Sequence, residues 1–152
     1  MRTRQRTEKG HEVEIKILNK AAEIFRKSGY AEFRMADLSK ETDMQLGAIT
    51  YYYRKKTNIL EKIFENYDCA IYNFLEQFDW FNNDTSLFRH ICSSIVFYTN
   101  ILNDPACLRF FLEVSECENI TSFYYRHIRE KYDKFYEDYD IEISDEKFRA
   151  CI

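Results

Sequence analysis

The chain has 152 residues, of which 45% are hydrophobic and 17% aromatic, and its formal net charge is −4. This length suits one domain or two small ones with a real core, and the composition excludes a disordered chain. No apolar run reaches the length of a bilayer span and the polar start MRTRQRTEKG lacks a signal peptide's apolar stretch, so we expect a cytoplasmic protein with no membrane partner.

The helices are expected in chain order, beginning with one over about 12–28. Its apolar residues recur at helical spacing, and Ser28-Gly29 ends it because glycine tolerates the left-handed conformation of a helix C-terminus. Two short helices follow over 34–41 and 45–52. The expected inward side chains are Val13, Ile17, Ala21, Ile24 and Phe25 in the first helix, and Met35, Ala36 and Leu38 in the second.

A long amphipathic helix over about 56–78 gives the strongest periodic signal. Asp84-Thr85 caps a helix to Leu102, and Asp104-Pro105 opens another to about Cys117. Further helices are predicted over 120–139 and from Ser144 onward, with no strand or repeat. The predicted inward residues are Ile59, Leu60, Ile63, Phe64, Tyr67, Ala70, Ile71, Phe74, Leu75 and Phe78, then Leu87, Phe88, Ile91, Ile95 and Tyr98, then Phe123, Tyr124, Ile128, Tyr132 and Phe135.

Charge is distributed unevenly along the chain. Residues 1–60 hold 13 basic and 8 acidic side chains, a balance of +5, and residues 61–152 have a balance of −9. This favours a polyanion-binding head on a body that avoids the polyanion, although chance surface charge is an equal alternative on the tally alone.

The segment 45-QLGAITYYYRKK-56 places three aromatics before three cations. Two short helices joined by 42-TDM-44 have the proportions of a helix-turn-helix, whose second helix lies in the DNA major groove. Gly47 would allow close approach of the backbone, while Gln45, Ala48 and Thr50 can meet base edges. Tyr51, Tyr52 and Lys56 are predicted to reach the sugar-phosphate backbone, with Lys56 seeking an anion because it lies at a helix N-terminus.

Ile49 and Tyr53 are expected to point the other way, into a three-helix core. The ring of Tyr53 should pack against Ile49 and Phe25, with its hydroxyl at the rim, paired by water or a backbone group. The alternative is that the tyrosines are ordinary core and surface aromatics, and that 54–56 is a solvated charge run.

From 17-ILNKAAEIFRKSGY-30 through 35-MADLSKETDMQLGAITYYYRKKTNIL-60, the chain resembles the DNA-binding domain of the TetR/AcrR family of bacterial transcription regulators. The resemblance covers about the first 65 residues and rests on an ordered set of motifs. It implies an all-α homodimer with an N-terminal three-helix helix-turn-helix domain, residues 1–60, and a helical C-terminal domain, residues 61–152, for effector binding and dimerisation. The implied DNA-contacting residues are Arg34, Gln45, Leu46, Gly47, Ala48, Thr50, Tyr51, Tyr52 and Lys56.

Several positions depart from the family's pattern. Phe33-Arg34 stands where a capping hydroxyl is common, so an arginine phosphate contact replaces it. Gln45 and Thr50 are also unusual, and Asp43 occupies a turn position often held by glycine, which aspartate tolerates better than most residues. The last helix pair, which dimerises in the family, looks incomplete, so we expect a truncated domain or another dimer surface.

The resemblance suggests a sequence-specific repressor that leaves its operator when a small-molecule or other effector binds the C-terminal domain. The alternative is a helical protein-interaction module that keeps the head fold but acts through partner proteins. Phe97, Tyr98, Phe110, Phe111, Phe123 and Tyr124 could line an effector pocket, although ordinary core is the simpler interpretation of each residue.

Neither a metal, a cofactor nor an enzyme activity is indicated by the remaining residues. His11, His90 and His127 have no ligand spacing, and no nucleophile elbow, phosphate-binding glycine loop or paired-carboxylate site occurs. The five cysteines are odd in number and contain no C-x-x-C pair, so we expect a reducing compartment and small core residues rather than disulfides or zinc.

Overall fold

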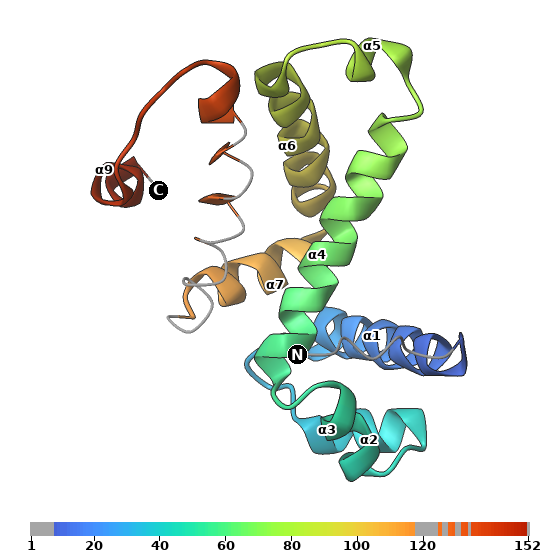
Figure 1. Ribbon diagram of the computed structural model, residues 1–152. Coiled ribbons are helices and arrows are strands. Elements are labelled where there is room, and N and C mark those ends of the chain that lie inside the picture. Colours follow the sequence, from blue (N-terminus) through green and yellow to red (C-terminus); the bar gives the residue numbers. More distant parts are fainter. Residues whose placement is uncertain (1–7, 118–124, 126–127, 130–131, 134, 152) are drawn as a thin grey trace, which may run out of the picture. The chain divides into compact units, whose positions relative to one another are not determined.

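A computed structural model describes residues 8–117, 125, 128–129, 132–133 and 135–151 (Figure 1). Its ordered elements are all α-helices, and no strand occurs within these ranges, as the all-α prediction requires. The chain forms two compact units, residues 1–66 and 67–152. The predicted functional division into 1–60 and 61–152 stays a prediction.

The first unit contains α1 (Glu8–Ser28), α2 (Met35–Thr42), α3 (Leu46–Tyr52) and the beginning of α4 (Lys56–Leu75). The predicted bounds are confirmed closely, except that α1 begins earlier. α1 packs on α2 and α2 on α3 (Figure 1). Ala36 is exposed, so its predicted inward position is wrong: α2 turns only Leu38 and Thr42 fully inward. The core consists of Ile17, Leu18, Ala21, Phe25, Tyr30, Phe33, Leu38, Ile49, Tyr53, Ile59, Leu60 and Phe64.

The helix ends in the first unit follow from local backbone chemistry. Gly29 ends α1 with φ 86°, and Asp43 ends α2 with φ 53°, both in the left-handed region. The predicted absence of a side-chain cap at Arg34 is confirmed, and Gln45 before α3 also makes no capping hydrogen bond. α2 and α3 are therefore held by tertiary contacts more than by their caps.

The second unit contains the end of α4, α5 (Asp79–Asn82), α6 (Ser86–Leu102), α7 (Pro105–Ser115) and α9 (Asp145–Cys151). α4 ends at Leu75, three residues before its predicted end, because the chain turns into α5. The predicted caps are confirmed: Thr85 Oγ1 accepts from the backbone N–H of Phe88, and Asp104 Oδ1 accepts from that of Ala106. Within the predicted helix 120–139, the described residues up to 138 are helical, whereas Phe123 and Tyr124 lie outside the described residues.

The predicted inner face of α6 is wrong. Leu87, Phe88, Ile91, Ile95 and Tyr98 are 37–60% exposed, whereas Ser93, Phe97 and Ile101 are buried. α6 is apolar on two faces, so helical periodicity alone fits either of them. Phe74 and Phe78, predicted inward on the long helix, are also exposed, as is Ala70. Helical periodicity marks these residues as one apolar face but does not decide whether another element covers it.

The cysteines are not core residues where they are described. Cys69 is exposed, and Cys92, Cys107 and Cys117 are half-buried, so that prediction is wrong for these four. No helix in the described part of the chain is both long and apolar enough to cross a membrane. Among the described residues, no group of three or more His, Cys, Asp or Glu side chains is placed so that it could hold a metal ion.

Candidate nucleic-acid interface

The helix α3 divides its side chains between the core and the solvent. Ile49 is fully buried and Tyr53, directly after the helix, is 6% exposed. The opposite face presents Tyr51, 75% exposed, and Leu46, 44% exposed. Gln45, Gly47 and Ala48 are also exposed, and Thr50 and Tyr52 are half-buried. Of the residues predicted to contact DNA in this segment, Gln45, Leu46, Gly47, Ala48 and Tyr51 are exposed, and we call these five the α3 face.

Gly47 lies in open space on the α3 face. A Cβ atom added there would meet nothing within 4 Å, so no neighbour within the chain requires a glycine at this position. Thr50 Oγ1 donates to the Gly47 carbonyl at 3.1 Å, which leaves the hydroxyl oxygen free to accept from a ligand. The rings of Tyr51 and Tyr52 meet edge to face at 5.5 Å, which holds both at the end of the helix.

Short hydrogen bonds fix the turn between α2 and α3. Ser39 Oγ donates to the Met44 carbonyl at 2.6 Å, and Thr42 Oγ1 donates to the Leu38 carbonyl at 2.7 Å. Thr42 is 1% exposed, so its hydroxyl needs this partner. Together with the left-handed Asp43, these bonds set the direction in which α3 leaves α2.

Two residues of α1, Lys16 and Glu14, make hydrogen bonds to the α2–α3 segment, and neither bond was predicted from the sequence. Lys16 Nζ donates to the Thr42 carbonyl at 2.8 Å, at the C-terminal end of α2 where a cation is favourable. The Tyr53 hydroxyl donates to Glu14 Oε1 at 2.8 Å. The predicted water or backbone partner for Tyr53 is therefore wrong, because α1 presents a carboxylate to the ring's edge. A signal existed: Glu14 shares the helical stripe of Leu18, Ala21 and Phe25, and an acid on a buried stripe needs a partner.

The cations after α3 differ in their surroundings. Arg54 and Lys55 are exposed, as is Arg34 at the beginning of α2. Lys56 Nζ donates to the Tyr30 carbonyl at 3.1 Å and lies 4.3 Å from the centre of the Tyr30 ring. Lys56 therefore has a partner within the chain that the sequence did not predict. Its ammonium carries three N–H donors, so the bond to Tyr30 orients the group and leaves donors for a phosphate.

The second unit has an aromatic cluster around α6 and α7. The Phe97 ring lies 5.4 Å from that of Tyr67 and 6.1 Å from that of Phe111, and Tyr98 joins them. Burial raises the pKa of Tyr67, and its hydrogen bond with Asn100 opposes this shift. The cluster lines neither of the surface hollows described next.

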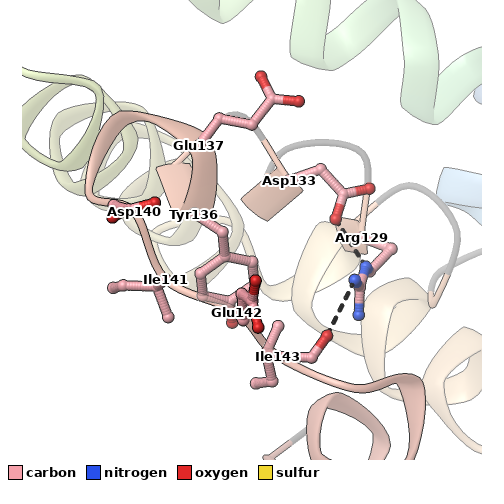
Figure 2. A pocket seen from close by; sticks show the side chains of 8 residues that line it. All are labelled: Arg129, Asp133, Tyr136, Glu137, Asp140, Ile141, Glu142 and Ile143. Atoms are coloured by element: carbon pink, nitrogen blue, oxygen red, sulfur yellow. Dashed lines mark hydrogen bonds and ion pairs between the residues drawn. The ribbon is translucent and has the colours of Figure 1, made fainter.

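One hollow of about 430 Å³ lies beside the segment that leads into α9 (Figure 2). Half of its eight lining residues are acidic, namely Asp133, Glu137, Asp140 and Glu142, which lie around Arg129. Arg129 is engaged by Asp133 at 2.7 Å and by Asp145 at 3.3 Å, so it is not aimed at a ligand. A second hollow of about 370 Å³ lies on α7 between Leu108 and Leu112. Neither matches the aromatic effector pocket considered from the sequence.

Three helices form the first unit's head, and the short α3 follows α2 after a tight turn with most of its side chains exposed. This is the arrangement of the helix-turn-helix DNA-binding proteins. Residues 17–63 match the family described as bacterial regulatory proteins, tetR family. Residues 17–63 are thus a TetR-family N-terminal helix-turn-helix domain, which belongs to a family of regulators and not of enzymes. A DNA-binding domain of this kind implies a transcriptional regulator. Neither the curated proteins nor the solved structures contain a match.

Proposed function

We propose that the protein is a dimeric repressor that binds an operator through the α3 face and leaves it when an effector binds the helical unit 67–152. The observation that carries the DNA-binding part is the division of the α3 segment. Ile49 and Tyr53 are buried, whereas Gln45, Leu46, Gly47, Ala48 and Tyr51 are exposed. An α-helix reads bases only if one of its faces is free of the protein core.

The proposed contacts fall into two kinds. Gln45, Leu46, Gly47, Ala48 and Thr50 would face base edges, where a glutamine amide can bond to adenine and small side chains can meet a thymine methyl. Arg34, Tyr51, Tyr52 and Lys56 would bind the phosphate backbone and fix the register of the helix. The basic balance of residues 1–60, +5 in a chain of −4, supports this assignment.

Release would follow from a change in the distance between the two heads of the dimer. Two recognition helices match successive major grooves only when they lie about 34 Å apart. An effector that binds better to a dimer with another spacing shifts the population away from the DNA-bound state. α4 is the element through which such a change would pass, since it contributes residues to both units.

A mobility-shift titration against genomic fragments at several salt concentrations tests the DNA-binding part. We expect affinity to fall steeply as salt rises, because phosphate contacts release counterions. An acidic competitor protein serves as the control for nonspecific charge effects. Binding that is absent at low salt, or present but insensitive to salt, would rule out the proposal and leave the protein-interaction alternative.

Two substitutions distinguish the kinds of contact. Lys56→Ala should weaken binding to all sequences alike and flatten the salt slope by about one unit. Gln45→Ala should relax the preference among operator variants by about 1–3 kcal/mol at one base pair, if its contact is bidentate. Because Lys56 also bonds to Tyr30, each variant's thermal melt is recorded beside its binding isotherm. The reverse pattern, with specificity lost at Lys56, would mean that α3 is rotated in the groove.

A further inference from the structure

The first turn of α3 carries no side chain that can form a hydrogen bond. It consists of Leu46, Gly47 and Ala48, and all three residues are exposed. In helix-turn-helix complexes the residues at the beginning of the second helix are those that contact base edges. The part of α3 that would lie closest to the bases therefore offers them only apolar side chains and backbone.

Charged side chains are absent from the whole of α3. Its sequence, LGAITYY, contains neither a basic nor an acidic residue. The exposed cations nearest to it along the chain are Lys40, before the turn, and Arg54 and Lys55, after the helix. Arginine and lysine make the commonest specific contact with guanine, and aspartate and glutamate accept from cytosine. The helix thus lacks the side chains that best select a G·C pair.

Two polar side chains of this segment can still form hydrogen bonds to bases. Gln45 is exposed and makes no capping hydrogen bond to α3, so its amide can bond to N6 and N7 of adenine. The Thr50 hydroxyl donates to the Gly47 carbonyl at 3.1 Å, which leaves its oxygen as an acceptor. An acceptor can bind the amino group of adenine or cytosine, but neither of the two guanine acceptors.

We propose that α3 reads A·T base pairs, with Leu46 and Ala48 against thymine methyl groups and Gln45 on adenine. The C5-methyl of thymine is the apolar group that bases present in the major groove, so apolar side chains in the first turn match it. Leu46 is 44% exposed, and its burial against such methyl groups is favourable. This inference rests on the proposed function, in which α3 enters the groove, and adds which base pairs lie beneath it.

Selection of binding sites by the full chain, from duplexes with a random central region, tests the base composition. The Leu46→Ala and Gln45→Ala proteins are selected in parallel, and the pairs beneath α3 are those at which these variants lose preference. We expect A·T pairs at these positions. G·C pairs there overturn the inference, as does binding without any sequence preference.

The salt dependence of binding distinguishes failure of the inference from failure of the proposed function. A protein whose affinity falls as salt rises, but which prefers G·C pairs beneath α3, refutes the A·T assignment alone. A protein that binds no duplex at low salt refutes the proposed function, and the A·T assignment with it.

Deoxyuridine in place of thymidine tests the methyl contacts themselves. The exchange removes only the C5-methyl and leaves every hydrogen-bonding group of the A·T pair in place. In the selected duplex it should weaken binding roughly fourfold for each thymine that α3 contacts, the usual effect of one buried carbon. The same exchange outside the α3 positions is the control and should change affinity little. Equal affinity for both duplexes overturns the inference, because A·T pairs would then be read without their methyl groups.

Leu46→Ala tests the protein side of the same contact. The side chain is exposed, so the variant should melt close to the parent, while at one or more thymines it loses the difference between thymidine and deoxyuridine. Ile15→Ala, at an isoleucine 45% exposed on α1, is the matched control and should keep that difference. A Leu46→Ala protein that keeps the full difference at every thymine overturns the assignment of Leu46 to a methyl group.

Discussion

Tyr53→Ala is expected to cost the first unit about 3–5 kcal/mol, the usual loss for truncating a large aromatic in a core. The ring is 6% exposed directly after α3, between the recognition helix and the rest of the core. Small domains have only about 5–15 kcal/mol of total stability, so this change should lower the melting temperature sharply or unfold the head. Thermal melts followed by circular dichroism measure the loss.

The matched variant Tyr53→Phe isolates the hydroxyl. A hydroxyl paired by water at the rim, as the sequence predicted, would make this change almost silent, but the 2.8 Å bond to Glu14 alters that expectation. Hydrogen bonds to charged groups contribute about 1.5–3 kcal/mol, so a loss toward the lower end of that range is expected. Glu14→Ala and the double variant complete a cycle, in which the two losses should not add.

Tyr51→Phe is the control for the opposite face. Tyr51 is 75% exposed, so the Tyr51→Phe protein should be as stable as the parent. Its DNA binding should weaken, because the variant lacks a phosphate-directed hydroxyl. If Tyr53→Ala melts like the parent while Tyr51→Phe unfolds, the facing assigned to α3 is wrong.

The head was predictable because its helices have one apolar face each. Ile17, Ala21 and Phe25 recur on a single stripe of α1, so the period itself indicates which side is buried. Ile49 in α3 and Tyr53 directly after it follow the same logic. Motif order then identified the helix-turn-helix, although its individual DNA contacts remain predictions.

The second unit shows where periodicity stops being sufficient. α6 is apolar on two faces, and only its neighbours decide that Phe97 lies inside and Ile95 outside. Long-range bonds escape prediction for a related reason. Glu14 and Tyr53 are 39 residues apart and Lys16 and Thr42 are 26 apart, so their pairing depends on how the helices pack and not on spacing along the chain.

Substitutions at Gly47 should change the stability of the fold and its affinity for DNA in opposite directions. It lies within α3 with nothing within 4 Å of an added Cβ. Alanine exceeds glycine in helix propensity, so Gly47→Ala should stabilise the fold by about 0.5–1 kcal/mol. If the α3 face lies against DNA, the same methyl group should weaken binding, because the groove then meets a side chain where it met backbone. A variant that is both more stable and a poorer DNA binder is the expected result.

Gly47→Glu should weaken DNA binding more than Gly47→Ala does, without unfolding the head. The side chain enters open space, but its carboxylate faces the phosphates, and we expect affinity for all sequences to fall at least about a hundredfold, or about 2.7 kcal/mol. Ala22→Glu, an equal charge at an exposed site on α1, should change binding far less. Melts and isotherms are measured for all three variants. A Gly47→Glu protein that binds DNA as the parent does would show that α3 does not enter the groove, whatever the first unit's resemblance to other regulators.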